Sequence, residues 1–400
     1  MIDQAEALEI VLAHSHSLGE EEVPLSSSIG RILAEDIRAD RPFPPFDRVC
    51  MDGIAIPFQA YDEGRRAFTK AAMAAAGDPQ KELKDQEQCI EIMTGAILPK
   101  GADTIVRYED LKETADGFEI TTEVKQGQNI HYRGEDTNQG DSILKHGLRV
   151  KAMDVNILAS VGKSSVWVRK QPKVAVISSG EELVPIDQQP EAHQIRRSNV
   201  HMLVARLDEL GIQAHEYHIR DKESDIRKWV VDILNSHDVL LLSGGVSKGK
   251  FDLIPQVLEE LGVEKRFHFV KQRPGKPLWF GTMENKRVFA FPGNPVSTLA
   301  CFHAYFVPWL YASLGLEYQA IKVKLSTDVQ FRPDLTYFAQ ARIWQDEQAV
   351  TWAEVKHGGG SGDMISPSTM DGFVILPRGK EEYKAGEVYL FLPFHPLCQG

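Results

Sequence analysis

Two stretches of the sequence decide the fold: residues 174–180, Val-Ala-Val-Ile-Ser-Ser-Gly, and residues 238–245, Asp-Val-Leu-Leu-Leu-Ser-Gly-Gly. Each is a short, uninterrupted apolar run followed by serine and glycine, which is typical of a strand buried on both faces of a parallel sheet. Further strands and helices alternate around them. We expect helices at residues 198–210, 223–235 and 252–261 and strands at residues 213–219 and 288–291. This alternation predicts a doubly wound, parallel α/β sheet.

The rest of the chain has a different character. Residues 3–14 have helical spacing, and we expect a second helix after Ser26-Ser27-Ser28. After a proline-rich linker, short alternating runs and recurrent turns between about 46 and 138 predict a compact, mostly-β unit. From about 319 the alternation returns without helices, which predicts a small C-terminal β domain.

Length and charge limit the classes of function. A chain of 400 residues is expected to form roughly two to four domains. Lys and Arg number 45 against 57 Asp and Glu, so the net charge is −12 and nucleic acid is disfavoured as a partner. An anionic ligand would therefore need a locally basic pocket.

Several features indicate a location away from membranes. Residues 296–316 lack Asp, Glu, Lys and Arg and are long enough to span a bilayer, but they contain His303 and Pro308. We expect a buried helix on a sheet there, not a membrane span. The four cysteines form no C-x-x-C pair, and the N-terminus does not resemble a signal peptide. These features favour a reducing, cytoplasmic compartment.

Three predicted strand ends carry unusual loops: residues 178–182 (SSGEE), 243–252 (SGGVSKGKFD) and 291–297 (FPGNPVS). Ligands of open α/β sheets bind at the carboxyl ends of the strands, and glycines let backbone amides approach an anion. The loops therefore predict an anionic ligand, most simply a phosphate. The middle loop nearly matches a P-loop, but Phe251 replaces the Ser or Thr that binds magnesium, which disfavours a nucleotide triphosphatase.

Charged residues near these loops predict two further features. Glu181, Glu182, Asp221 and Asp252 follow strands, and two carboxylates about 4 Å apart repel by roughly 4 kcal/mol. Such a cluster beside a phosphate needs a cation, and its oxygen ligands suit Mg²⁺. The loop at 271–277 (KQRPGKP) is basic and stiffened by prolines, so it predicts an oxyanion site.

Six short motifs occur along the chain in a fixed order. They are Met51-Asp52-Gly53, Met93-Thr94-Gly95-Ala96, Arg133-Gly134-Glu135-Asp136, Ser243-Gly244-Gly245-Val246-Ser247, Pro274-Gly275-Lys276-Pro277 and Pro292-Gly293-Asn294-Pro295-Val296-Ser297. Their order and spacing resemble the molybdopterin molybdenumtransferase family, which includes the bacterial MoeA proteins and the gephyrin E domain. One such motif is weakly specific, but six in order over nearly the whole chain are highly specific.

The resemblance implies a multidomain α/β-plus-β fold with four domains. These are an elongated domain at 1–45 plus 139–170, an inserted mostly-β domain at 46–138, a doubly wound molybdopterin-binding α/β domain at 171–318, and a small barrel-like β domain at 319–400. It also implies a homodimer whose active site lies between the α/β domain of one subunit and the inserted domain of the other. The implied reaction converts adenylylated molybdopterin and molybdate into molybdenum cofactor and AMP with a divalent cation, here Mg²⁺. Possible protein partners are the adenylyltransferase and proteins that deliver the cofactor to molybdoenzymes.

The resemblance carries functional roles to matching positions. The family's functional polar positions correspond to Asp52, Thr94, Asp136, Glu182, Asp221 and Asp252, and its prolines to Pro292 and Pro295. By charge, we expect Glu182, Asp221 and Asp252 to hold Mg²⁺, and Asp52 and Asp136 to come from the partner subunit. We expect the substrate to be bound by Ser179, Gly180, Gly244, Gly245, Val246, Ser247, Lys271, Arg273, Lys276, Pro292, Pro295 and Ser297.

Several positions depart from the family pattern. Glu181 replaces an Asp, Arg196-Arg197 replaces a Tyr-Asp pair, and His131 and Gln340 stand where basic residues are usual; Lys271 or His131 could compensate. Two alternatives remain at the level of sequence. One is an adenylyltransferase or nucleotide-hydrolysing relative, and the other is a non-catalytic, pterin-binding scaffold.

Overall fold

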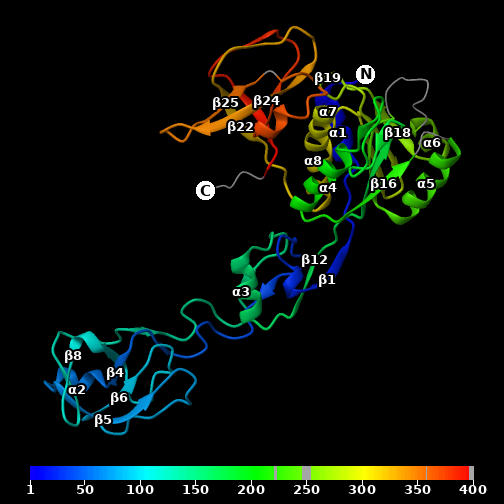
Figure 1. Ribbon diagram of the computed structural model, residues 1–400. Coiled ribbons are helices and arrows are strands. Elements are labelled where there is room, and N and C mark those ends of the chain that lie inside the picture. Colours follow the sequence, from blue (N-terminus) through cyan, green and yellow to red (C-terminus); the bar gives the residue numbers. More distant parts are fainter. Residues whose placement is uncertain (220–222, 246–253, 357, 396–400) are drawn as a thin grey trace. The chain divides into compact units, whose positions relative to one another are not determined.

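The computed structural model describes residues 1–219, 223–245, 254–356 and 358–395, which form two compact units (Figure 1). The large unit comprises Met1–Glu21, Gly30–Ile32 and Val168–Gly400, and the small unit comprises Glu22–Ile29 and Leu33–Trp167. The division into four domains with the boundaries given above stays a prediction.

A six-stranded sheet forms the centre of the large unit. Its strands, in spatial order, are β16 (Ala214–Ile219), β13 (Val174–Ser179), β17 (Val239–Ser243), β21 (Lys286–Phe291), β20 (Trp279–Met283) and β18 (Glu264–His268). The first four are parallel, as the apolar runs predict. β20 runs antiparallel to both of its neighbours, β21 and β18, and is joined to β21 by a tight two-residue turn that only an antiparallel pair permits.

Helices cover both faces of this sheet (Figure 1). One face packs against α1 (Gln4–Ala13), α4 (Asn199–Glu209), α7 (Pro295–Cys301), the π-helix η3 (Phe302–Phe306) and α8 (Val307–Ser313). The other face packs against α5 (Glu223–Ser236) and α6 (Ile254–Glu260). Successive residues of β13 enter the two cores alternately, so the doubly wound architecture is confirmed.

The apolar stretch at 296–316 forms α7, η3 and α8, and its side chains are almost all buried against the sheet. The expectation of a buried helix is therefore confirmed. Within the described ranges, no helix is both long enough and apolar enough to cross a membrane.

The chain of the large unit ends in a closed, five-stranded barrel. Its strands are β24 (Thr336–Gln345), β25 (Thr351–Val355), β22 (Ile321–Leu325), β28 (Val388–Pro393) and β26 (Gly372–Leu376), and β26 pairs back to β24. The short strand β19 (Gln272–Arg273) joins β24 in parallel and so ties the basic loop to the barrel. Smaller elements are β14 (Leu183–Val184), β15 (Ile195–Arg196), β23 (Val329–Gln330), β27 (Glu382–Tyr383) and η4 (Ser366–Thr369).

The small unit contains a second six-stranded sheet. Its strands, in spatial order, are β7 (Thr104–Arg107), β4 (Gly53–Ile56), β6 (Gln88–Ile92), β5 (Ala67–Ala74), β9 (Gly117–Ile120) and β8 (Leu111–Glu113). The predicted mostly-β character is confirmed. The other elements are η1 (Leu25–Ser27), β2 (Ile37–Arg38), β3 (Arg48–Val49), α2 (Phe58–Asp62), η2 (Tyr108–Asp110), β10 (Ile130–His131), β11 (Ser142–Leu144) and α3 (Ala152–Ser160), and β1 (Glu20–Pro24) pairs with β12 (Ser165–Arg169).

The prediction of a helix after Ser26-Ser27-Ser28 is wrong. The chain makes only the single 3-10 turn η1 there and then continues through turns to the short strand β2. Gly30 explains the difference, because its φ of +77° is a left-handed conformation that ends helical geometry.

Candidate functional site

Three strand ends of the large unit lie in contact. The strands β13, β17 and β21 are neighbours, and the backbone N of Gly244 donates to the carbonyl of Phe291 at 3.1 Å. A Cβ on Gly244 would lie 3.0 Å from the carbonyl oxygen of Ser179, and the φ of Gly244 is +99°. Glycine at this position therefore allows the loops to approach closely, as the loop sequences predict.

A cavity of about 670 Å³ opens at these strand ends, and we call it the strand-end cavity. It is lined by Ser178, Ser179, Glu182, Leu183, Pro190, Gln194, Ile195, Arg196, Arg197, Ser198, Asn199, Val200, Ser243, Gly244, Gly293, Asn294, Pro295, Gly362 and Met364. Glu182 is the one carboxylate among these described residues. Its oxygens lie over Gly180, where an added Cβ would be 2.6 Å from Oε2.

Part of the predicted metal set falls outside the described ranges. Asp221 and Asp252 belong to segments that the structure does not describe, as do Val246 and Ser247. Within the described parts of the chain, no group of three or more His, Cys, Asp or Glu side chains could hold a metal ion. Glu182 is thus the single member of the predicted trio whose position is known.

Asn199 is a structural link that the sequence did not reveal. Its side-chain amide donates to Ser243 Oγ at 2.9 Å and to the carbonyl of Gly293 at 2.7 Å. Because Ser243 ends β17 and Gly293 lies in the loop after β21, this one side chain fixes two strand ends against each other. The only available signal was its place at the start of an amphipathic helix, behind the unusual Arg196-Arg197 pair.

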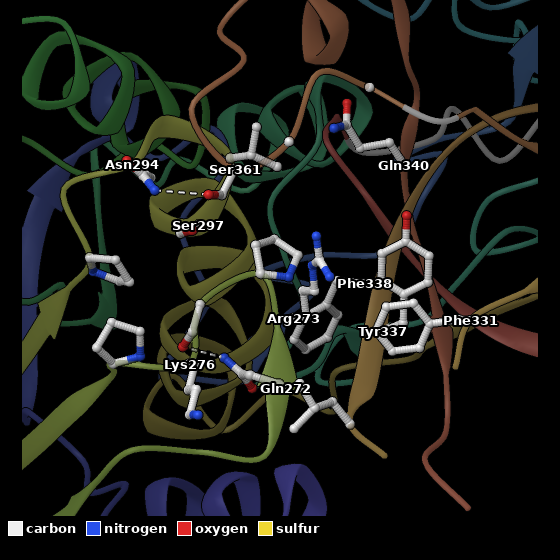
Figure 2. Close-up of a pocket in the computed structure, with 18 of the residues that line it drawn as sticks. Gln272, Arg273, Lys276, Asn294, Ser297, Phe331, Tyr337, Phe338, Gln340 and Ser361 are labelled. Atoms are coloured by element: carbon white, nitrogen blue, oxygen red, sulfur yellow. Dashed lines mark hydrogen bonds between the residues drawn. The ribbon is translucent and has the colours of Figure 1, made fainter. Parts of the chain in front are cut away.

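A second cavity, of about 500 Å³, lies beside the basic loop, and we call it the basic cavity (Figure 2). It is lined by Gln272, Arg273, Pro274, Gly275, Lys276, Pro277, Pro292, Asn294, Val296, Ser297, Gln330, Phe331, Leu335, Tyr337, Phe338, Gln340, Gly358, Gly360 and Ser361. These described residues include two cations and no carboxylate. The described lining of the cavity is therefore locally basic, which is what an anionic ligand would need in a protein of net charge −12.

Buried contacts fix the basic loop. Gln272 is fully buried, and its side-chain amide donates to the carbonyl of Gly275 at 2.9 Å. The hydroxyl of Tyr305 on η3 donates to the amide oxygen of Gln272. Gly275 has φ +90°, and a Cβ there would lie 2.6 Å from Cys301 Sγ. The backbone between Arg273 and Lys276 is therefore held in place before any ligand binds.

Lys271 is separated from the other two predicted cations. Its Nζ lies 3.3 Å from Asp3 Oδ1, and it lines neither cavity. Arg273 and Lys276 both line the basic cavity, together with Pro292 and Ser297. A spacing of two residues in a turn is enough to direct neighbouring side chains to different surfaces.

The barrel contributes a glycine-rich loop that sequence reasoning missed. Asn294 Nδ2 donates to Ser361 Oγ at 2.8 Å, and this contact joins the loop after β21 to the run Gly358-Gly359-Gly360-Ser361 (Figure 2). The carboxylate of Asp363 accepts the backbone N–H groups of Gly359 and Ile365, and these bonds hold the pKa of Asp363 well below its usual range. Three consecutive glycines were the signal available in the sequence.

Gln340, one of the departures from the family pattern, lines the basic cavity. Only 7% of the residue is exposed, and its amide oxygen accepts from Ser366 Oγ at 3.0 Å. The side chain is neutral and held in place, so it adds hydrogen-bonding capacity and no charge. Asn294 lines both cavities, so the strand-end cavity and the basic cavity adjoin.

The small unit brings two predicted residues together. Asp52 precedes β4 and Thr94 follows β6, and these strands are antiparallel neighbours. The backbone N and Oγ1 of Thr94 donate to Asp52 Oδ1 at 2.6 and 2.8 Å, and these bonds lower the pKa of the Asp52 carboxyl. Asp136 lies elsewhere in the same unit, where His131 Nε2 is 2.9 Å from its Oδ1.

Comparison with known families covers almost the whole chain. The description "MoeA N-terminal region (domain I and II)" matches residues 2–162, "Probable molybdopterin binding domain" matches residues 175–312, and "MoeA C-terminal region (domain IV)" matches residues 322–394.

Individual relatives agree with this result. A molybdopterin molybdenumtransferase of Synechocystis is 39% identical over 98% of this chain and 99% of its own length, and one of Staphylococcus epidermidis is 31% identical over 97% and 94%. The crystal structure of a molybdopterin biosynthesis MoeA protein from Pyrococcus horikosii matches with a TM-score of 0.82 at 31% identity, over 99% of this chain and 100% of that one. The chain therefore belongs to the molybdopterin molybdenumtransferase (MoeA) family.

Proposed function

We propose that this protein inserts molybdenum into adenylylated molybdopterin and releases AMP, which yields molybdenum cofactor. The observation that carries the proposal is the pair of adjoining cavities. One has glycine-bearing strand ends beside a single carboxylate, and the other has two cations and no carboxylate among the described lining residues. Relatives that match over nearly the whole chain bear the name of this transferase, so an adenylyltransferase or a scaffold is not favoured.

The two cavities suggest a division of roles. Beside the strand-end cavity, the backbone N–H groups of Ser179, Gly180 and Gly245 would hold the phosphate of the pterin. The N–H of Gly244 donates to Phe291, so Gly244 would contribute by leaving room for the phosphate to approach where no Cβ intervenes. The loop prolines Pro292 and Pro295 would keep the neighbouring strand end rigid. Val246 and Ser247 would extend the same phosphate site.

In the basic cavity, Arg273 and Lys276 would hold molybdate oxygens by charge-assisted hydrogen bonds, with Ser297 as a neutral donor. Asn294 lies in both cavities and would sit between the two ligands. In this arrangement the attacking oxyanion would lie next to the phosphoanhydride that is cleaved. Holding two reactants in such contact is a large source of rate enhancement.

The described residues fit a magnesium ion in part. Glu182 presents a carboxylate at the phosphate end of the strand-end cavity, and magnesium is usually held by one or two carboxylates together with substrate phosphates and water. We propose that Glu182, Asp221 and Asp252 would hold it. When bound, Mg²⁺ would neutralise charge that develops on the phosphoryl oxygens.

We further propose that the protein acts as a cytoplasmic homodimer in which a second copy supplies Asp52, Thr94 and Asp136. Mixing Asp52→Ala with Glu182→Ala protein tests this, since each hybrid dimer would contain one intact site. Random mixing should recover roughly a quarter of the wild-type rate. Mixtures that stay inactive would show that the site is not shared. The adenylyltransferase and cofactor-delivery proteins remain proposed partners.

The proposed reaction is tested by incubating the purified protein with adenylylated molybdopterin. We expect AMP release that requires both molybdate and Mg²⁺. AMP release without molybdate would indicate simple hydrolysis, and no release with all components present would contradict the proposal.

A further inference from the structure

Arg48, His131 and Asp136 form a chain of hydrogen bonds in the small unit. The strands β3 and β10 pair antiparallel, which places Arg48 directly opposite His131. Arg48 Nη2 lies 3.0 Å from His131 Nδ1, and His131 Nε2 lies 2.9 Å from Asp136 Oδ1. Both ring nitrogens therefore have one partner each.

The chemistry of the partners fixes the direction of both hydrogen bonds. A guanidinium has only donors, so Nδ1 of His131 must accept from Arg48 and cannot carry a hydrogen. A neutral imidazole with a bare Nδ1 carries its hydrogen on Nε2, and that hydrogen points at a carboxylate that can only accept. The chain thus runs in one direction, from Arg48 through the ring to Asp136.

The neighbouring acids do not compete for the imidazole. Asp47 Oδ1 accepts the backbone N–H of Arg133 at 2.8 Å, and Glu135 Oε2 accepts the backbone N–H of Tyr132 at 2.9 Å. Both carboxylates are engaged in shaping the loop between His131 and Asp136. Asp136 is therefore the acid that this histidine orients.

We propose that Arg48 is a positioning residue that fixes His131 in its Nε2–H tautomer, so that neutral His131 aims the carboxylate of Asp136. The inference rests on the proposed function, because Asp136 is a proposed site residue. It also gives His131 a different role from the basic residue usual in the family. The ring is a directional donor, and the positive charge is carried by Arg48, on the adjacent strand.

The tautomer can be measured without any assay of activity. Nitrogen-15 NMR of histidine-labelled protein near neutral pH, with the His131 signal assigned through a His131→Gln variant, should show hydrogen on Nε2 alone. Arg48→Ala should weaken the preference for hydrogen on Nε2, because only Asp136 then favours that tautomer, so a detectable fraction with hydrogen on Nδ1 should appear. Arg48→Lys, which also only donates, should preserve the single form. Hydrogen on Nδ1 in the wild type, or an unchanged ring in Arg48→Ala, would overturn the proposal. The signals of the other histidines report whether each variant is folded.

The rate of AMP release tests the catalytic consequence. Glutamine can accept from Arg48 and donate to Asp136, so His131→Gln should recover most of the rate that His131→Leu loses. We expect His131→Leu and Arg48→Ala to lose on the order of tenfold to a hundredfold in kcat, with little change in KM.

The variant His131→Arg distinguishes two roles for His131, that of a directional hydrogen-bond donor and that of a substitute cation. It should be impaired, because two guanidiniums would then face each other. If His131→Arg retained full rate while His131→Gln failed, His131 would be a substitute cation and the proposal would be wrong. If the wild-type protein released no AMP, the proposed function would be contradicted. The tautomer of His131 would still be decided by the NMR experiment, which does not depend on activity.

Discussion

The strand-end cavity and the basic cavity share Asn294 but are built in different ways. The strand-end cavity forms where parallel strands end, and it mixes Glu182 with the cations Arg196 and Arg197. The basic cavity forms where a stiff loop meets the barrel, and its described lining contains no acid. A carboxylate beside a phosphate calls for a metal ion, whereas two cations alone can hold an oxyanion directly. The contrast supports our proposal that a metal ion binds in the strand-end cavity and the oxyanion binds in the basic cavity.

Removing the carboxylate of the strand-end cavity should have the largest effect. Glu182→Gln keeps the shape of the side chain but removes its charge, so we expect AMP release to fall on the order of a hundredfold or more. The matched control is Glu181→Gln, because Glu181 is exposed and does not line the cavity. If Glu182→Gln released AMP at close to the wild-type rate at saturating Mg²⁺, the proposal that a metal ion acts in this cavity would be contradicted.

Removing a cation from the basic cavity should weaken molybdate binding next most strongly. Lys276→Ala should raise the KM for molybdate by about tenfold to a hundredfold, since one charge-assisted hydrogen bond is lost. Lys276→Arg keeps the charge and should lose less. Lys271→Ala should raise this KM less than Lys276→Ala, because Lys271 pairs with Asp3 outside the cavity. Equal increases of this KM in Lys271→Ala and Lys276→Ala would contradict the placement of Lys271 outside the basic cavity.

Adding a cation to the basic cavity should have a smaller and opposite effect. Gln340→Arg places a third positive charge in the cavity, and we expect the KM for molybdate to fall roughly threefold. The isosteric control Gln340→Glu should raise it. A melting curve of each variant checks that the lost hydrogen bond from Ser366 leaves the barrel folded.

The smallest effect concerns Asp52 in the small unit. Thr94 lowers the pKa of Asp52, so the ionised carboxylate is favoured in the fold; this stabilisation is present above the unfolded pKa and is lost as pH falls through the folded pKa. Thr94→Val removes the hydroxyl donor and leaves the backbone donor, so the pKa of Asp52 should rise part of the way to its usual value. Carbon-13 NMR titration measures this shift, and Thr94→Ser should not show it. An unshifted pKa in Thr94→Val would mean that the hydroxyl contributes nothing.

The sequence predicted those parts of the fold that depend on local pattern. The apolar runs at 174–177 and 239–242 form buried parallel strands because uninterrupted burial on two faces requires such runs. The helix expected after Ser28 was wrong because the left-handed turn at Gly30 outweighs the capping potential of the serines. The three strand-end loops and the basic loop were recognised by their glycines and prolines, whereas the glycine-rich loop at 358–361 was missed.

Contacts between distant segments could not be read from the sequence. Asn294 meets Ser361 only because the barrel docks beside the α/β sheet, and nothing local to either residue indicates the other. The same holds for Arg48 and His131, which lie 83 residues apart and become neighbours through the β3–β10 pair. Lys271 shows this limit most clearly. Other residues of its loop line the basic cavity, but the side chain of Lys271 pairs with Asp3, a distant residue that nothing in the loop sequence indicates.

The most direct test of the division between the two cavities is equilibrium binding of molybdate to Glu182→Gln and Lys276→Ala measured side by side. If the cavities have separate roles, Glu182→Gln binds molybdate as tightly as the wild type, although its AMP release is strongly reduced, and Lys276→Ala binds molybdate at least about tenfold more weakly. Normal binding by Lys276→Ala together with weak binding by Glu182→Gln would place the oxyanion in the strand-end cavity and contradict the account.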